Sequence, residues 1–263
     1  MIAAGSGAET RDLVVIGAGT LLLAVHLYRW ARGRDMLAVG PPPRARFGIM
    51  EALAVFLLGL LTQQFLLRAG LEIWPGDAPE PTANRYLFSY LGPVPLACLG
   101  FFLLVRRNRE HGPRVRGAAC GFLVWLAWFP VVYAVLAATQ LVWDALGKEW
   151  TDQDILEVLR SSAGWKFALA AVVCAPLYEE VVFRGLLYPA FRRRLARVPA
   201  ILLVSAVFAV MHGSPGHRPA LFVLSIAITW TYERTGTLAG PIAFHAVFNG
   251  WTFLSEMLSA GGS

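Results

Sequence analysis

A short run of ionisable residues interrupts the hydrophobic second half of this sequence. The segment 174–191 reads CAPLYEEVVFRGLLYPAF and places Glu179, Glu180 and Arg184 close together. On a helix, Glu180 and Arg184 share a face and can pair, because they are four residues apart. Glu179 is rotated by about 100° from Glu180, since a helix turns once every ~3.6 residues. We expect the arginine to hold one carboxylate while the other carboxylate faces a cavity.

Two further pairs with one-turn spacing follow this segment. Phe208 precedes His212 in FAVMH, and His245 precedes Asn249 in HAVFN. With a rise of about 1.5 Å per residue, Glu180 and His212 lie roughly 18 and 21 Å from the arginine-rich ends of their predicted helices. His245 and Asn249 lie roughly 10 and 16 Å from the corresponding end of theirs. Three helices should therefore deliver these side chains to overlapping depths.

This set of side chains suits the hydrolysis of an acyl bond by water. A carboxylate beside an imidazole can accept a proton from water. A second histidine and an asparagine amide can donate hydrogen bonds to the oxyanion of a tetrahedral intermediate. No serine or cysteine stands beside a histidine in a recognisable nucleophile motif. Water is therefore the expected nucleophile.

The composition indicates where such helices would lie. Hydrophobic residues make up 57% of the 263 residues and charged residues 15%, whereas soluble domains have about 25% charged residues. About 20 apolar residues cross a hydrocarbon core of ~30 Å as a helix. We predict an all-α, polytopic transmembrane helical bundle of about eight spans, with a polar catalytic cavity among the C-terminal helices. The predicted spans are 13–30, 48–67, 87–105, 118–143, 165–191, 198–212, 219–233 and 238–258.

The charges between these spans alternate along the chain. Arginines cluster after the first, third and fifth predicted spans, while the connections 68–86 and 144–164 are acidic or poor in charge. Because positively charged loops stay in the cytoplasm, we expect the arginine connections there and both termini outside. These clusters account for the net charge of +6, and no nucleic-acid partner is expected. The segment 144–164 could form an interfacial helix or a plain exterior loop.

The whole chain is predicted to form one membrane domain, 1–263. Its N-terminal spans, 1–145, carry no recognisable motif, and 165–258 forms the catalytic helical core. The run 13–30 reads as a retained span and not as a cleaved signal peptide. Three cysteines without a CxxC pair support neither a disulfide framework nor a thiolate zinc site. An arginine-rich, alanine-rich chain with few lysines suggests a GC-rich bacterial genome, so we expect a multi-pass protein of the bacterial inner membrane.

The order EExxxR, FxxxH and HxxxN on successive predicted helices resembles the CAAX-protease and bacteriocin-processing family (CPBP, Abi) of glutamic intramembrane endopeptidases. The resemblance covers about residues 165–253. It implies that Glu179 activates a water with His212. It also implies that His245 and Asn249 form the oxyanion site.

In the same resemblance, Glu180 and Arg184 orient or stabilise the catalytic carboxylate. Phe208 would pack near the site as a candidate substrate-cavity residue, although an ordinary core position fits it equally well. The expected partners are the lipid bilayer and a membrane-associated protein or peptide substrate. A prenylated protein, a bacteriocin and a C-terminal sorting anchor all remain open as substrates, and the oligomeric state is unknown.

Two other functions remain open. Two glutamates and two histidines could bind zinc, which accepts both ligand types. We expect no cofactor, because there is no HExxH motif and Arg184 would oppose a cation. Alternatively, the chain could be a non-catalytic immunity or scaffold protein, or a small transporter. The transporter alternative is disfavoured by the lack of matching broken helices or an internal repeat.

Overall fold

The computed structural model describes residues 6–32, 45, 47–105, 114–148, 153–212 and 215–260, and all regular structure in them is helical. The predicted all-helical fold is therefore confirmed for this part of the chain. The helices are α1 (Ser6–Ala31), α2 (Ile49–Ile73), α3 (Pro79–Ser89), α4 (Pro93–Val105), α5 (Arg114–Ala145), α6 (Gln153–Arg160), α7 (Gly164–Leu169), α8 (Ala175–Glu180), α9 (Tyr188–Arg192), α10 (Arg197–Met211), α11 (Arg218–Thr235) and α12 (Ala239–Ala260), with two π-helical segments, η1 (Ala170–Cys174) and η2 (Val181–Leu187).

Among the described residues, four helical stretches are long and apolar enough to cross a membrane. They are Arg11–Arg29, Ile49–Ile73, Pro79–Val105 and Val115–Ala145, and Arg197–Met211 forms a shorter apolar helix. The first four predicted spans overlap these stretches. The expected total of about eight spans is not reached on length and composition. One reason is that α10 is short, with 15 residues, and another is that the glutamate-bearing helix is divided into short pieces.

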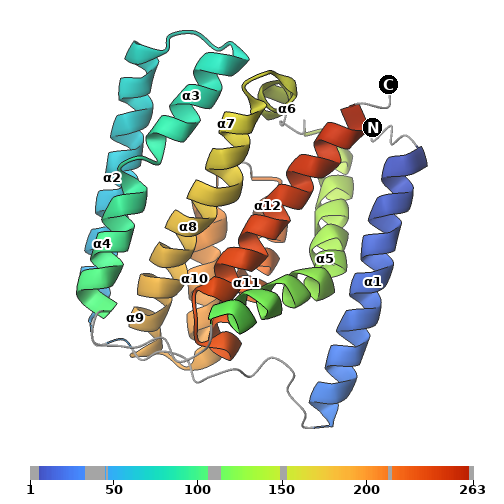
Figure 1. Ribbon diagram of the computed structural model, residues 1–263. Coiled ribbons are helices and arrows are strands. Elements are labelled where there is room, and N and C mark those ends of the chain that lie inside the picture. The colour runs from blue at the N-terminus through green and yellow to red at the C-terminus, as the bar shows by residue number, and fades with distance from the viewer. Residues whose placement is uncertain are drawn as a thin grey trace.

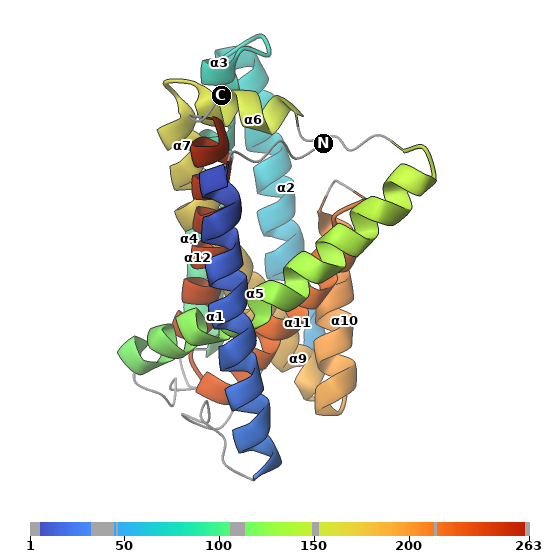
Figure 2. The same cartoon turned by 90° about the vertical axis from the view of Figure 1, so that its right-hand side faces the viewer.

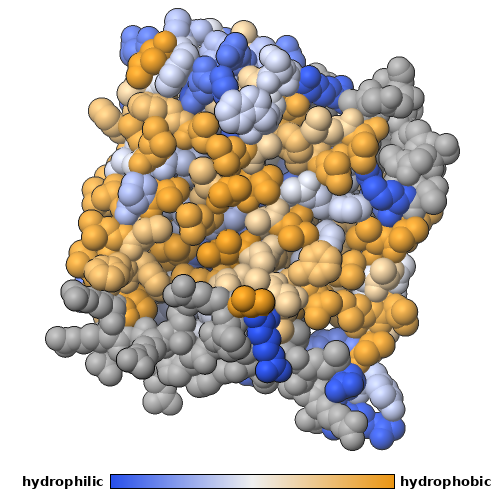
Figure 3. Space-filling model, in the orientation of Figure 1, coloured by the Kyte–Doolittle hydropathy of each residue, from blue (hydrophilic) through white to orange (hydrophobic). Residues whose placement is uncertain are grey.

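The surface of the molecule carries a wide hydrophobic band. Figure 3 shows this band across the middle of the face, with hydrophilic residues gathered toward its upper edge. Large hydrophobic side chains are exposed on several helices: Leu21 and Phe65 are each 68% exposed, and Leu141 is 72% exposed. Water-soluble proteins rarely expose contiguous apolar areas of this extent. The chain is an integral membrane protein with several membrane-spanning helices.

The arrangement of the helices separates the two ends of the bundle. Figure 1 shows the N- and C-terminal ends of the chain at one edge, and the ends of α1, α4 and α9 at the opposite edge. The charge pattern predicts such an arrangement, in which the ends of the first, third and fifth spans lie opposite the chain ends. Most of the predicted arginine connections, 33–44 and 106–113, lie outside the described residues.

The segment 144–164, left open between an interfacial helix and a loop, contains the helix α6. Val158 and Leu159 on α6 are buried against Ala83 of α3 and against Ala163 and Phe167. The apolar side of α6 therefore packs on the protein itself. Residues 149–152 of this segment lie outside the described part of the chain.

The glutamates lie on one continuous helical rod, residues 164–192, which is built from α7, η1, α8, η2 and α9. Each π-helical segment directly precedes a helix whose first turn contains a proline, Pro176 in α8 and Pro189 in α9. Proline lacks an N–H, and its ring clashes with the carbonyl four residues earlier in an α-helix. A wider π turn accommodates that ring, and such turns are frequent at functional sites.

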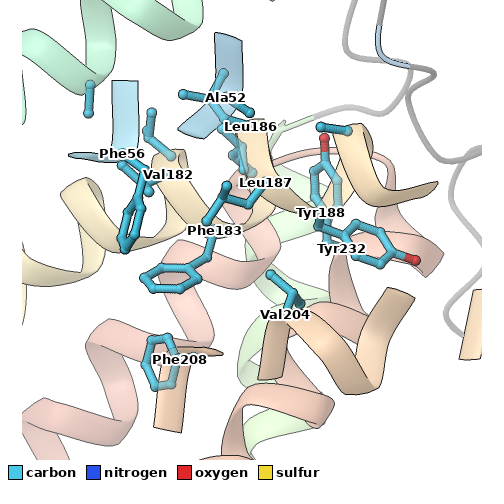
Figure 4. Packing of buried hydrophobic residues seen from close by; sticks show 14 of the residues in the cluster. Ala52, Phe56, Val182, Phe183, Leu186, Leu187, Tyr188, Val204, Phe208 and Tyr232 are labelled. Carbon is cyan, nitrogen blue, oxygen red and sulfur yellow. The ribbon is translucent and has the colours of Figure 1, made fainter. Parts of the chain in front are cut away.

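Buried side chains of this rod form the centre of the main hydrophobic core. Val182, Leu186 and Leu187 are nearly or fully buried and pack with residues of α2 and α10. Figure 4 shows this cluster, with Phe183 and Phe208 next to each other at its lower edge. The core therefore fixes the rod against α10, the helix that carries Phe208 and leads to His212.

A second core holds α12 in place through α5, which crosses the bundle obliquely (Figure 2). The two helices touch through glycines: a Cβ atom added to Gly121 would overlap the carbonyl oxygen of Gly240. Gly19 of α1 meets the Leu126 carbonyl of α5 in the same way. Small residues allow membrane helices to approach closely. At these glycines, α5 packs closely against both α1 and α12.

Candidate active site

Glu180 and Arg184 form a fully buried ion pair. Arg184 Nη1 lies 2.8 Å from Glu180 Oε1, and both side chains are 0% exposed. The remaining guanidinium donors reach α11, where Nε donates to Thr229 Oγ1 at 3.2 Å and Nη2 donates to Ser225 Oγ at 2.7 Å. The pairing expected from the four-residue spacing is present. A buried arginine with this many acceptors is held in a single orientation.

Glu180 also holds His245 of α12. The same oxygen, Oε1, lies 2.7 Å from His245 Nδ1, and His245 is 3% exposed. A carboxylate can only accept here, so Nδ1 carries the hydrogen. This leaves Nε2 as the ring atom that points toward Glu179. Glu180 thus sets the orientation of His245 while its own charge is balanced by Arg184.

Glu179 faces two imidazole rings. Its Oε2 lies 3.8 Å from His212 Nε2 and 4.0 Å from His245 Nε2. The side chain of Glu179 is 16% exposed and that of His212 is 33% exposed, so this side of the site opens outward. Both distances exceed a direct hydrogen bond and match groups that share a water molecule.

His212 is oriented by the backbone of its own helix. It follows the last residue of α10, and its Nδ1 lies 2.7 Å from the carbonyl oxygen of Phe208. Because a carbonyl only accepts, Nδ1 carries the hydrogen, as in His245. Both rings therefore present Nε2 to Glu179.

Phe208 lies beneath the two rings and is fully buried. Its ring centroid is 4.4 Å from that of His212 and 5.9 Å from that of His245. The guanidinium carbon of Arg184 lies 4.9 Å from the Phe208 ring centroid. This ring therefore contacts three of the polar groups and helps to fix their relative positions.

Asn249 lies one turn beyond His245 on α12, and its side chain reaches across to η1. Nδ2 donates to the Ala171 carbonyl oxygen at 2.7 Å. An amide nitrogen has two N–H groups, so one remains for another acceptor. The structure thus brings Glu179, Glu180, Arg184, His212 and His245 together and places Asn249 beside them, bound to the π-helical segment.

Residues 161–251 match the family described as type II CAAX prenyl endopeptidase Rce1-like. This segment of the chain is similar to the Rce1-like family. The matched residues include the whole rod that carries the glutamates, both histidines and Asn249. The helices α1 to α6 lie outside the match.

Three curated proteins are similar to part of the chain. A UPF0177 protein in the abiGi 5′ region of Lactococcus lactis subsp. cremoris is 37% identical over 31% of this chain and 34% of its own length. The membrane-embedded CAAX protease MroQ of Staphylococcus aureus is 30% identical over 35% and 40%, respectively. The UPF0177 protein YaiH of Lactococcus lactis subsp. lactis is 32% identical over 31% and 34%. The chain thus spans about a third to two fifths of these relatives, and no solved structure matches it.

Ser225 and Thr229 are parts of this site that were not predicted from the sequence. Both are fully buried, and both accept hydrogen bonds from Arg184. They lie in the predicted span 219–233, two and one helical turns before Glu233. Their spacing could have identified them, because two hydroxyl groups one helical turn apart form a polar stripe on a mostly apolar helix.

The described residues contain no group of three or more His, Cys, Asp or Glu side chains arranged to hold a metal ion.

Proposed function

We propose that this chain is an intramembrane peptidase that hydrolyses a peptide bond of a membrane-associated protein or peptide. The observation that supports it best is the convergence of Glu179 Oε2 with His212 Nε2 and His245 Nε2, at 3.8 and 4.0 Å. A water molecule between these atoms can give a proton to the carboxylate while it attacks. The membrane-embedded protease among the similar proteins agrees with this reaction class.

In the proposed reaction, Glu179 accepts a proton from the water, and His212 Nε2 orients it. The water oxygen forms a bond to the carbonyl carbon of the substrate, and the carbonyl oxygen becomes an oxyanion. The carbon–nitrogen bond then breaks, and the proton taken up by Glu179 passes to the departing amine. The products are a carboxylate and an amine, so no further reactant is needed.

The oxyanion is proposed to lie between His245 and Asn249. His245 Nδ1 already donates to Glu180, so a donor at Nε2 requires the imidazolium form. The Glu180 carboxylate would be the counter-ion of that cation, and Arg184 holds Glu180 in place. Asn249 contributes the amide hydrogen that Ala171 does not use. Removing one such donor typically lowers a rate by about 100- to 1,000-fold.

Glu179→Gln is the direct test, because glutamine keeps the size of the side chain and loses the basic group. We expect cleavage to fall by about 100-fold or more. Glu80→Gln is the matched control, since Glu80 pairs with Lys166 at an exposed site on α3. The measurement compares uncut membrane proteins in cells that carry each variant. Equal cleavage by the native chain and Glu179→Gln at equal abundance would refute the mechanism.

The same cells separate the two alternatives. A scaffold or immunity protein should keep its phenotype in Glu179→Gln, because the variant alters no surface used for assembly. A zinc peptidase should lose activity in a strong chelator and recover it on zinc addition. We expect activity of the purified chain to persist in chelator.

A further inference from the structure

A cavity separate from the candidate active site opens at the edge of the bundle where α9 ends. It has a volume of about 280 Å³. The first turn of α2, from Gly48 to Glu51, forms one wall, and Ala190, Arg193 and Arg194 form the other. The cavity contains no residue proposed for catalysis. It brings the two cationic side chains that directly follow the rod against the beginning of a second helix.

Arg193 and Arg194 differ from the neighbouring Arg192 in their contacts. Arg192 is bound to the buried Glu233, with Nε 2.8 Å from Oε1, and this contact belongs to the packing of α9 on α11. Arg193 Nη1 instead donates to the backbone oxygen of Phe47 at 2.5 Å, which holds its guanidinium at the cavity wall. A guanidinium has five N–H groups, so most of those of Arg193 can serve a ligand. Arg194 adds a second cation at the same wall.

The opposite wall adds positive potential of its own. The first backbone N–H groups of a helix have no partner within the helix, and the aligned peptide dipoles give that end a partial positive charge. Glu51 offsets part of this, since its Oε2 accepts the Gly48 N–H at 3.0 Å. The cavity wall thus holds two guanidinium groups and a helix N-terminus but only one carboxylate. Its net charge is positive. The cavity therefore favours an anion.

The position of the cavity indicates the source of that anion. It lies at the edge of the bundle where α2 begins and α9 ends (Figure 1), directly after the apolar stretch of the rod. Met50, on the α2 wall, is 76% exposed and provides an apolar surface at the cavity. A ligand that joins a phosphate to acyl chains satisfies both features. Basic pockets between membrane helices are known to take anionic headgroups.

We propose that this cavity binds the phosphate of an anionic phospholipid headgroup, with the acyl chains lying along the apolar surface beside Met50. Arg193 and Arg194 contact the phosphate oxygens. The lipid then links the start of α2 to the end of the rod that carries Glu179 and Glu180. This inference does not depend on the proposed peptidase activity.

The test uses the full chain, purified and delipidated in a neutral detergent. It is titrated with short-chain phosphatidylglycerol, with short-chain phosphatidylcholine and with inorganic phosphate, and native mass spectrometry counts the bound molecules. We expect phosphatidylglycerol to bind most tightly. Arg193→Gln and Arg194→Gln should each weaken its binding by about fivefold, the usual contribution of one basic residue near an anionic surface.

Two further variants distinguish a built site from general attraction. Arg197→Gln removes an exposed arginine at the start of α10 that does not line the cavity, and it should change binding by less than about twofold. Glu51→Gln removes the opposing charge but keeps an oxygen for the Gly48 N–H, so binding should strengthen. Equal loss in Arg197→Gln, or equal binding of phosphatidylcholine, would overturn the proposal. Inorganic phosphate that binds as tightly as the lipid would overturn the lipid as its source.

Discussion

Glu179 and Glu180 are adjacent in the chain, yet their carboxylates have different surroundings. Glu180 is fully buried and contacts Arg184 and His245. Glu179 is partly exposed and lies just beyond hydrogen-bond distance of two imidazole rings. Oε1 of Glu180 is held by permanent partners, whereas Oε2 of Glu179 has no hydrogen-bond partner among the described residues. At the scale of single residues, this difference separates a positioning role from a chemical one.

The same difference predicts that substitutions of the two glutamates change stability by unequal amounts. Glu180→Gln leaves the Arg184 charge buried without its counter-ion, and we expect a loss of about 3–5 kcal/mol in the free energy of unfolding. Glu179→Gln should change that free energy by less than about 1 kcal/mol. Unfolding of the purified chain in detergent measures both. Similar losses in the two variants would show that Glu179 is also part of the structural network.

At the scale of the elements, α12 is connected to the rod near the site by a second hydrogen bond, besides the one between His245 and Glu180. Asn249 reaches from α12 to the Ala171 carbonyl in η1. Asn249 therefore has two proposed roles. It holds α12 against the π-helical segment, and it donates a hydrogen bond to the oxyanion.

Asn249→Ala removes both duties at once. We expect a loss of about 1 kcal/mol in stability from the missing hydrogen bond. We also expect a fall of about 100-fold in the cleavage rate from the missing donor. Unfolding measurements and a cleavage assay on the same preparation separate the two effects. A stability loss with an unchanged rate would limit Asn249 to helix packing.

The crossing of α5 and α12 makes a second prediction at this scale. Gly121→Ala would place a methyl group on the Gly240 carbonyl, which forces the helices apart and moves His245 away from Glu179. We expect lower stability, by about 1–3 kcal/mol, together with reduced cleavage. Gly17→Ala on α1 is the matched control, because nothing lies within 4 Å of its added Cβ atom. If both variants behave as the native chain, the close crossing does not position the site.

Parts of this architecture could be predicted from the sequence. The Glu180–Arg184 pair follows from four-residue spacing, and the common depth of Glu180, His212 and His245 follows from helical rise. The π-helical segments did not follow, because an apolar run reads the same whether its turns are narrow or wide. The Asn249–Ala171 contact could not be predicted either, since it depends on the lateral distance between two helices, which periodicity does not contain.

For the molecule as a whole, the two chain ends lie at one edge, opposite the ends of α1, α4 and α9 (Figure 1). Arg29 at the end of α1 and Arg192 at the end of α9 belong to that opposite edge, and positively charged loops remain in the cytoplasm. A periplasmic reporter such as alkaline phosphatase, fused after Ser263 in a bacterial host, should therefore be active. A cytoplasmic fluorescent reporter at the same position should stay dark. The reverse result would invert the proposed orientation.

The length of α10 has a consequence for the surrounding bilayer. Its 15 residues span about 22 Å at a rise of ~1.5 Å per residue, against a hydrocarbon thickness of ~30 Å. Figure 2 shows α10 confined to the lower part of the molecule, while α2 runs along most of its height. Such hydrophobic mismatch thins the adjacent leaflet or draws polar headgroups inward. His212 follows the last residue of α10, so acyl-chain length should tune how deeply the hydrated boundary reaches toward this histidine.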